Sequence, residues 1–153
     1  MRSRFSGPLF IVGLPRSGTK LLRDLLNQNS RIGIPTVETH FIPFMLNQFG
    51  ERPNFENEQE FDEFYKEFAR TPFYWNMYKQ GRILDKKTLA ITADLTSWAS
   101  IFETILKYYA PFDRRTGFIW GDKTPGYVNH MPLLKELFPQ GRFLHIISLT
   151  MAH

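Results

Sequence analysis

Residues 13–20 bring glycines, hydroxyl groups and cationic side chains together in one short stretch of this 153-residue chain. Gly13 and Gly18 bracket a loop, and its polar side chains are Arg16, Ser17, Thr19 and Lys20. A glycine-bounded loop between a strand and a helix points backbone N–H groups and a helix N-terminus at one anion. The stretch therefore predicts a site for a phosphate-like anion with cations beside it.

The order of residues after Gly18 differs from that of nucleoside triphosphatases. Their pattern, G-x-x-x-x-G-K-[ST], has a lysine directly after the second glycine, where it reaches the β and γ phosphates. Here Thr19 takes that place, and the cation nearest the middle of the loop is Arg16. The order argues against a nucleotide kinase or triphosphatase, but that alternative stays open, with Asp94 as its Mg²⁺ ligand. A tight turn alone would explain the glycines, but not the polar residues between and after them.

Three stretches resemble the sulfotransferase family. Pro-Arg-Ser-Gly-Thr at 15–19, after an apolar strand, resembles the 5′-phosphosulfate-binding loop, most closely that of bacterial members and of the tyrosylprotein branch. Gly-Asp-Lys-Thr-Pro at 121–125 is similar to the block whose lysine faces the transferring sulfuryl group. Glu-Thr-His-Phe-Ile-Pro at 38–43 resembles the segment that supplies the catalytic carboxylate in the tyrosylprotein branch.

The resemblance implies sulfuryl transfer from 3′-phosphoadenosine 5′-phosphosulfate to a hydroxyl or amine of a small-molecule, carbohydrate or peptide acceptor. Arg16 and Lys123 would stabilise the developing negative charge, and Glu38 would take the acceptor proton. His40 is the second candidate for the base, because histidine has that role in the cytosolic branch. The donor would be held by Arg16, Ser17, Gly18, Thr19 and Lys20. No metal is required, and the sequence shows no metal-ligand cluster.

Plainer interpretations of two of these residues stay open. Glu38 lies where we expect a helix to begin, and a carboxylate there complements the helix dipole. Lys123 would also suit a solvated turn at the end of a strand. Neither interpretation needs a catalytic role.

The last residues depart from the family pattern. The strand at 142–147 would normally run into Arg-Asp-x-Arg-Asp and a later serine, which hold the donor's 3′-phosphate, but residues 148–153 are Ser-Leu-Thr-Met-Ala-His. Ser148 would donate one hydrogen bond and would not replace the bidentate contact of an arginine. We therefore expect the N-terminal half of a family domain, and a non-catalytic nucleotide-binding fragment is a further alternative.

The apolar pattern predicts the elements that position these residues. Residues 1–153 should form one partial sulfotransferase-like domain of the α/β class, a three-layer P-loop-type fold with a mostly parallel sheet flanked by helices. Strands are predicted at 9–12, 89–94, 118–123 and 142–147, and helices at 19–28, 36–49, 61–68, 98–109 and 129–138. The first of these helices has apolar residues at amphipathic spacing: Leu21, Leu22, Leu25 and Leu26. The aromatic stripe at 61–68 should be core; the alternative is that some of its rings, or Phe73, Tyr74 and Trp75, line an acceptor pocket.

Composition and charge limit the remaining classes of function. The formal net charge is +4 without a dense run of Lys and Arg, which argues against a nucleic-acid partner. The absence of cysteine excludes disulfides and thiolate metal sites. The apolar run after the basic N-terminus is short and is interrupted by Gly13 and Pro15. We therefore expect neither a signal peptide nor a membrane span, and a cytoplasmic location.

We predict that the chain alone has little or no sulfotransferase activity and is marginally stable. A charge-assisted contact contributes about 1.5–3 kcal/mol, so the missing arginine should weaken donor binding by roughly 10–100-fold. Uncovered apolar surface at the strand 142–147 should favour self-association. The purified protein should bind a hydrophobic dye and melt broadly at low temperature. A cooperative melt, together with sulfuryl turnover at ordinary enzyme rates, would contradict this prediction.

Overall fold

The computed structural model describes residues 4–111 and 117–147, and the residues predicted to replace the 3′-phosphate motif lie outside these ranges. The described part is α/β and contains a four-stranded sheet in the order β2-β3-β1-β4, with every ladder parallel. The strands are β1 (Leu9–Gly13), β2 (Ile32–Gly33), β3 (Ile119–Lys123) and β4 (Arg142–Ile146). The predicted fold class is confirmed, although β4 lies at the edge of this sheet rather than within it.

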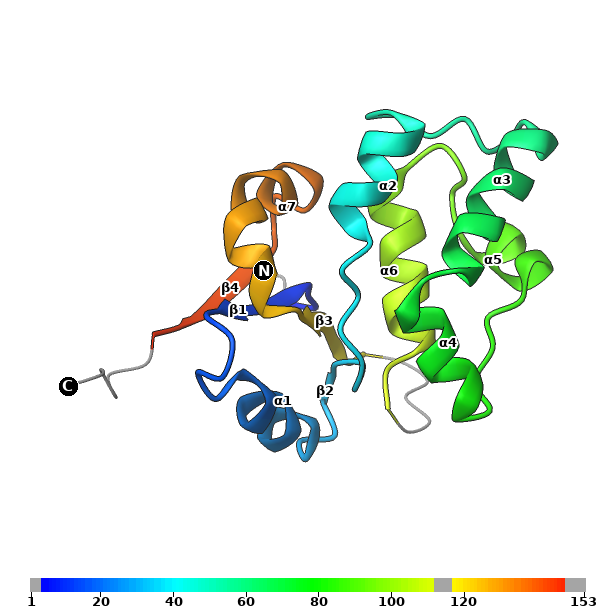
Figure 1. Ribbon diagram of the computed structural model, residues 1–153. Helices are drawn as coiled ribbons and strands as arrows, with labels where there is room; N and C mark the ends of the chain where they lie inside the picture. Colours follow the sequence, from blue (N-terminus) through cyan, green and yellow to red (C-terminus); the bar gives the residue numbers. More distant parts are fainter. Residues whose placement is uncertain (1–3, 112–116, 148–153) are drawn as a thin grey trace.

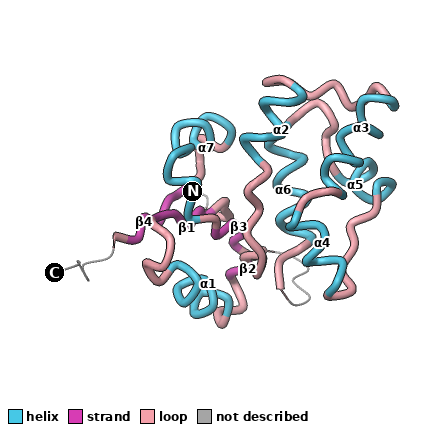
Figure 2. Tube along the Cα trace, viewed as in Figure 1, coloured by secondary structure: helices cyan, strands magenta, loops and turns pink. Residues whose placement is uncertain are grey.

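Seven α-helices and one 3₁₀-helix accompany the sheet in the described part of the chain. In Figure 1, α1 lies on one side of the sheet and α7 on the other, so the sheet is the middle of three layers. Figure 2 shows the helices α2 to α6 gathered together beyond β2 and β3. The helices are α1 (Thr19–Asn27), α2 (Ile42–Phe49), α3 (Glu58–Ala69), α4 (Pro72–Lys79), α5 (Lys86–Thr92), α6 (Trp98–Tyr108), η1 (Pro125–His130) and α7 (Met131–Leu137).

The predicted strand at 89–94 is wrong, because most of it belongs to α5. The side chain of Asp85 caps this helix by accepting the N–H of Thr88 at 2.8 Å. A short apolar run does not distinguish a strand from a helix by periodicity, and here the cap favours the helix. Asp94 follows the helix, where its carboxylate accepts the N–H and the hydroxyl of Thr96 at 2.9 and 2.7 Å. It is not the strand-end metal ligand that a triphosphatase would need.

Two predicted helices have other bounds than expected. The helix expected from residue 36 begins at Ile42, where Pro43 fits the first turn because a proline there lacks only an N–H that would have no helical partner. Residues 34–41 therefore have no regular secondary structure. The helix expected from Asn129 is divided into η1 and α7, and His130 rather than Asn129 occupies the N-cap of α7.

The helix α1 turns part of its polar face inward. Leu21 and Leu25 are 64% and 53% exposed, whereas Arg23 and Asn27 are 5% and 8% exposed. The spacing of the leucines correctly predicted a helix, but two of the four point into solvent. The inward polar side chains bond the irregular segment 34–41, which decides the orientation of the helix.

Segment 34–41 takes its hydrogen bonds from side chains instead of a strand ladder. The amide of Asn27 both donates to the carbonyl and accepts the N–H of Ile34, each at 2.8 Å. Arg23 donates to the carbonyl of Thr36 at 3.0 Å. Buried backbone polar groups are costly when unpaired, so these bonds hold the first half of the segment against α1.

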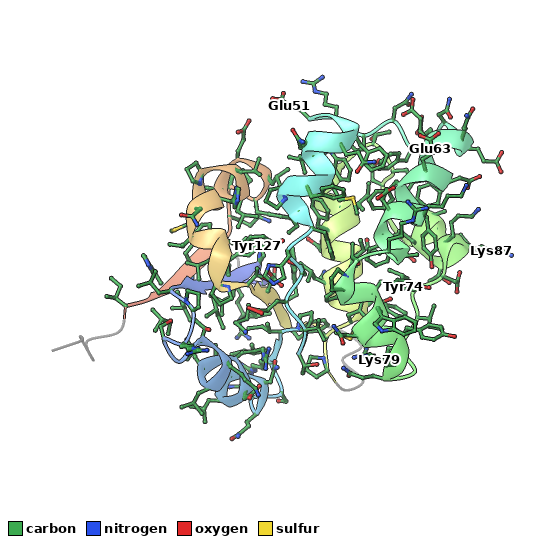
Figure 3. All side chains as sticks on the ribbon, in the orientation of Figure 1. Glu51, Glu63, Tyr74, Lys79, Lys87 and Tyr127 are labelled. Carbon is green, nitrogen blue, oxygen red and sulfur yellow. The ribbon has the colours of Figure 1, made fainter. Side chains whose placement is uncertain are left out.

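The second half of the segment is anchored to β3 and η1 by a buried polar network. Thr39 donates its N–H to Thr124 Oγ1 at 3.0 Å and its hydroxyl to Asp122 Oδ2 at 3.1 Å. Tyr127 Oη lies 2.7 Å from Thr39 Oγ1 and accepts the N–H of Ile42 at 3.1 Å. Figure 3 shows Tyr127 among the side chains between the sheet and this segment. Thr39, Asp122, Thr124 and Tyr127 are all at most 3% exposed.

Asp122 is the acidic end of this network. Its Oδ1 is buried without a hydrogen-bond partner among the described residues. The pKa of Asp122 is raised to about 7, and burial is the main cause. The hydrogen bonds from Thr124 and Thr39 lower this pKa, the charge of Glu38 raises it, and the charge of Lys123 lowers it. An unsatisfied carboxylate oxygen is expensive to bury, so the neutral acid is favoured up to about neutral pH.

The raised pKa of Asp122 predicts a specific pH dependence of stability. Between about pH 4 and pH 7 the folded chain binds a proton at Asp122 that the unfolded chain has released, so the free energy of unfolding falls as pH rises. From pH 5 to pH 8, urea unfolding should show the parent losing about 1 kcal/mol or more relative to Asp122→Asn. Contributions of the groups that do not interact with Asp122 cancel in this difference. Equal losses in both proteins would contradict the prediction.

Candidate active site

The loop at residues 13–20, called the anion loop because we predict that it binds an anion, lies at the same edge of the sheet as Lys123. In the parallel ladder Ile11 of β1 pairs with Lys123, and Gly13 pairs with Ile146 of β4. The loop leaves β1 after Gly13, so its first residue outside the strand lies three residues beyond Ile11, the position paired with Lys123. Ligands of open α/β sheets bind at this carboxyl edge.

The backbone of the loop leaves the start of α1 open. Gly18 is the N-cap in a left-handed conformation, with φ 92°, and no side chain caps this end within the described residues. The first helical bond is made by the N–H of Leu22 to the carbonyl of Gly18 at 3.0 Å. The N–H groups before Leu22 have no intrahelical partner, and with the helix dipole they form a site suited to an anion. At the other end, a Cβ on Gly13 would lie 2.5 Å from the carbonyl oxygen of Ile146, so only glycine fits.

The side chains of the predicted donor site differ in what they offer a ligand. Arg16 and Lys20 are exposed, and Arg16 has a left-handed backbone with φ 62°. Ser17 Oγ donates to the carbonyl of Leu14 at 2.5 Å, which braces the loop itself. Thr19 is only 4% exposed at the start of α1. The charged side chains of the loop are therefore exposed, whereas its two hydroxyl side chains are partly or fully buried.

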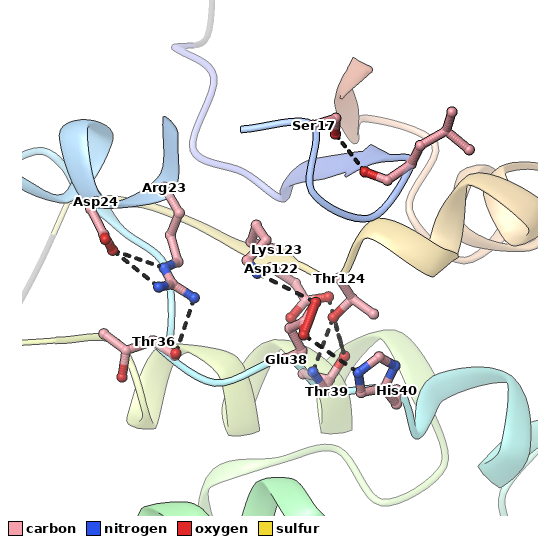
Figure 4. Close-up of polar contacts among 11 residues, drawn as sticks. Ser17, Arg23, Asp24, Thr36, Glu38, Thr39, His40, Asp122, Lys123 and Thr124 are labelled. Carbon is pink, nitrogen blue, oxygen red and sulfur yellow. Dashed lines mark hydrogen bonds and ion pairs between the residues drawn. The ribbon is translucent and has the colours of Figure 1, made fainter. Parts of the chain in front are cut away.

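Glu38 lies between two basic groups. Its Oε1 is 3.3 Å from Lys123 Nζ, and its Oε2 is 3.7 Å from His40 Nε2. Figure 4 draws these contacts as dashed lines. The side chain of Lys123 is 7% exposed, that of Glu38 34% and that of His40 61%. A carboxylate with each oxygen facing a separate nitrogen is held in one orientation. The buried ammonium and the accessible carboxylate form a pair suited to charge stabilisation and proton transfer.

This geometry brings together residues that the sequence placed in separate stretches. Glu38 and Lys123 are in contact, and His40 is beside them, so Lys123 is not a solvated turn residue. Glu38 precedes the first residue of α2 by four positions and faces an ammonium, so the helix-dipole interpretation is wrong. Arg16 belongs to neither ion pair and stays on the loop at the end of β1.

A cavity of about 260 Å³ adjoins His40 on the side of α3 and α4. Phe41, Phe44 and Pro72 provide its apolar wall. Arg70 and Glu67, which form a 3.3 Å ion pair, are also part of its lining. The aromatic residues that the sequence suggested for an acceptor pocket lie elsewhere, because the ring of Phe73 is in the core and Trp75 is 56% exposed on α4.

The sequence patterns did not indicate the residues that hold segment 34–41. These are Thr39, Thr124 and Tyr127 on one side, and Arg23 and Asn27 on the other. The only local signal was the i, i+4 spacing of Arg23 and Asn27, which places both on one face of α1. The contacts of Thr39 with β3 join stretches far apart in the sequence and leave no local pattern.

The described residues form neither a cluster of metal ligands nor a helix that could span a membrane. No group of three or more His, Asp and Glu side chains lies in an arrangement that would hold a metal ion in residues 4–111 and 117–147. Over the same ranges, no helix combines the length and the apolar character that crossing a bilayer requires.

Comparison with known proteins agrees with the site. No curated protein matches the chain at a significant level. The sulfotransferase family, however, matches residues 8–147, a range that contains the anion loop, Glu38 and Lys123. The match extends from the residue before β1 to the residue after β4. Because it covers most of the sequence, the chain belongs to the sulfotransferase family.

Proposed function

We propose that this protein transfers a sulfuryl group from 3′-phosphoadenosine 5′-phosphosulfate to a hydroxyl or amine. The observation that carries the proposal is the contact of Glu38 with Lys123 at the carboxyl edge of the sheet, next to an open helix N-terminus. Family membership supplies the class of reaction, and these groups supply a binding place for the donor and a base for the acceptor.

In the proposed reaction the acceptor oxygen or nitrogen attacks the sulfur, and the bond from sulfur to the bridging oxygen breaks. The electron pair of that bond leaves on the 5′-phosphate, which gives adenosine 3′,5′-bisphosphate. The N–H groups at the start of α1, with Ser17 and Thr19, hold the 5′-phosphate. Arg16 and Lys123 stabilise charge on the bridging oxygen and the sulfuryl group. Glu38 accepts the acceptor proton, and His40 is the second candidate for that role.

The acceptor remains a small molecule, a carbohydrate or a peptide. The cavity beside His40 is the place we assign to its reacting group, because His40, which faces the Glu38 carboxylate, is part of its lining and its wall is apolar. No metal and no nucleic acid enter the proposal. The cytoplasm remains our prediction for the compartment and rests on the sequence alone.

Self-association is a further part of the proposal. Large apolar side chains are exposed on the loop, on α1 and along β4: Leu14, Leu21, Leu25, Leu144 and Ile147, each at least 38% exposed. An edge strand with exposed apolar residues favours pairing with another chain.

Replacing Arg16 tests the donor site. Arg16→Ala should weaken the binding of adenosine 3′,5′-bisphosphate at least about tenfold, or 1.4 kcal/mol, in isothermal titration. Arg52→Ala is the matched control, because Arg52 is an exposed arginine just after α2 and should bind as the parent does. Equal affinity of all three proteins would remove Arg16 from the site. Binding without any transfer would favour the non-catalytic fragment.

Comparing Glu38 with His40 tests the base. In a chain completed with a family C-terminal half, Glu38→Gln should slow transfer by roughly 10²-fold, because the isosteric amide cannot accept the proton. His40→Ala should have a much smaller effect. A large loss in His40→Ala with an almost unchanged Glu38→Gln would assign the base to His40.

A further inference from the structure

Glu38 and Lys123 are each next in sequence to residues of the same buried network. Thr39 directly follows Glu38, and Lys123 lies between Asp122 and Thr124. The hydrogen bonds of Thr39 run to both neighbours of Lys123, at 3.1 Å to Asp122 Oδ2 and 3.0 Å to Thr124 Oγ1. The backbone on which the carboxylate is mounted is therefore attached to the strand that carries the ammonium.

The donors of this network form one chain that ends on Asp122. Tyr127 Oη accepts the N–H of Ile42, so its own proton is available for Thr39 Oγ1 at 2.7 Å. Thr39 has a single hydroxyl proton, which it donates to Asp122 Oδ2. Each hydroxyl is thus oriented by the acceptor after it. Without an acceptor at position 122, the Thr39 hydroxyl would lose the acceptor on the strand that carries Lys123.

The other described contacts that hold the segment lie further along the backbone from Glu38. Segment 34–41 has no strand ladder, and its bonds to α1 are made at Ile34 and Thr36, before Glu38. After it, Phe41 packs into the aromatic core, with ring centroids 5.7 Å from Phe68 and 5.5 Å from Phe73. Between these anchors the network at Thr39 is the attachment nearest to Glu38.

We propose that Asp122 and Thr39 are positioning residues, which hold the Glu38 carboxylate within contact of Lys123 for the transfer reaction. This role rests on the proposed function, because it assigns the network to a pair that the proposed function makes catalytic. A network that only stabilised the fold would contribute to unfolding free energy, and its loss would leave the contact between Glu38 and Lys123 unchanged.

The hydrogen bond from Thr39 to Asp122 is compatible with both the neutral and the charged form of Asp122. Asp122 accepts the Thr39 hydroxyl on Oδ2, and Oδ1 remains for a proton. The ionisable groups whose charges act on Asp122 or respond to it are Glu38, Lys123 and Tyr127. Protonation therefore changes the charge of Asp122 without removing the acceptor that Thr39 uses.

Asp122 itself reports whether Glu38 stays in place. Because the charge of Glu38 raises the pKa of Asp122, Glu38→Gln should lower that pKa in carboxyl ¹³C NMR titrations. In a Thr39→Val background the same substitution should change it by less than half as much, since Glu38 is then released. A Thr39→Ser background should keep the full effect. Thr104→Val, which removes a hydroxyl bonded within α6, is the matched control.

The titration decides the proposal without any turnover. An equal effect of Glu38→Gln in the parent and in Thr39→Val would overturn it. If Thr39→Val does not fold, Thr39→Ala serves as the second background, because it removes the same hydroxyl with a smaller side chain. The effect of Glu38→Gln should again fall by at least half, and an undiminished effect would again overturn the proposal.

Kinetics separate this inference from the proposed function. In a form that transfers sulfuryl groups, Thr39→Val should lower kcat by about tenfold or more with the KM for the donor unchanged, and Thr39→Ser should restore kcat to within about threefold. Turnover in the parent with an unchanged kcat in Thr39→Val would refute the positioning role and leave the function intact. A lack of transfer activity in the chain completed with a family C-terminal half would refute the function, and the titration would still decide whether Thr39 and Asp122 position Glu38.

Discussion

The hydrogen bonds of Thr39 with Asp122 and Thr124 are the contact on which the arrangement of this protein depends. They join an irregular segment to the end of a buried strand, and so join the helices α2 to α6, which that segment enters, to the sheet. Buried polar groups must be paired, which makes such a contact geometrically demanding. Segment 34–41 consequently has one docked position, although it forms no secondary structure.

The network includes a buried carboxyl, which stability alone does not favour. An apolar residue of similar size at position 122 would avoid the desolvation of Asp122 and its unsatisfied Oδ1. Polar networks are better understood as devices that specify one arrangement than as sources of stability. In this protein the arrangement that is specified places an accessible carboxylate against a buried ammonium, and this matches the needs of a transfer reaction.

The two sides of the site are built by different physical means. The anion loop depends on backbone geometry, namely a parallel strand, two glycines and an uncapped helix N-terminus. The positions of Glu38 and Lys123 depend on side-chain packing, because Phe41 is inserted among aromatic rings on one side and Arg23 and Asn27 reach from α1 on the other. These polar contacts explain why α1 exposes Leu21 and Leu25, which periodicity alone would have turned inward.

The sequence by itself determined the parts that follow from local spacing. It predicted the strand, loop and first helix, the aromatic helix at 61–68, the helix at 98–109 and the α/β class, because each has a periodicity or a turn signal of its own. It also supplied Arg16, Glu38 and Lys123 as candidates. Only the tertiary structure decided that Glu38 and Lys123 touch, that residues 89–92 belong to a helix, and that Thr39 is hydrogen-bonded to Asp122. Those outcomes depend on hydrogen bonds and packing between distant stretches, and such contacts leave no period in a single sequence.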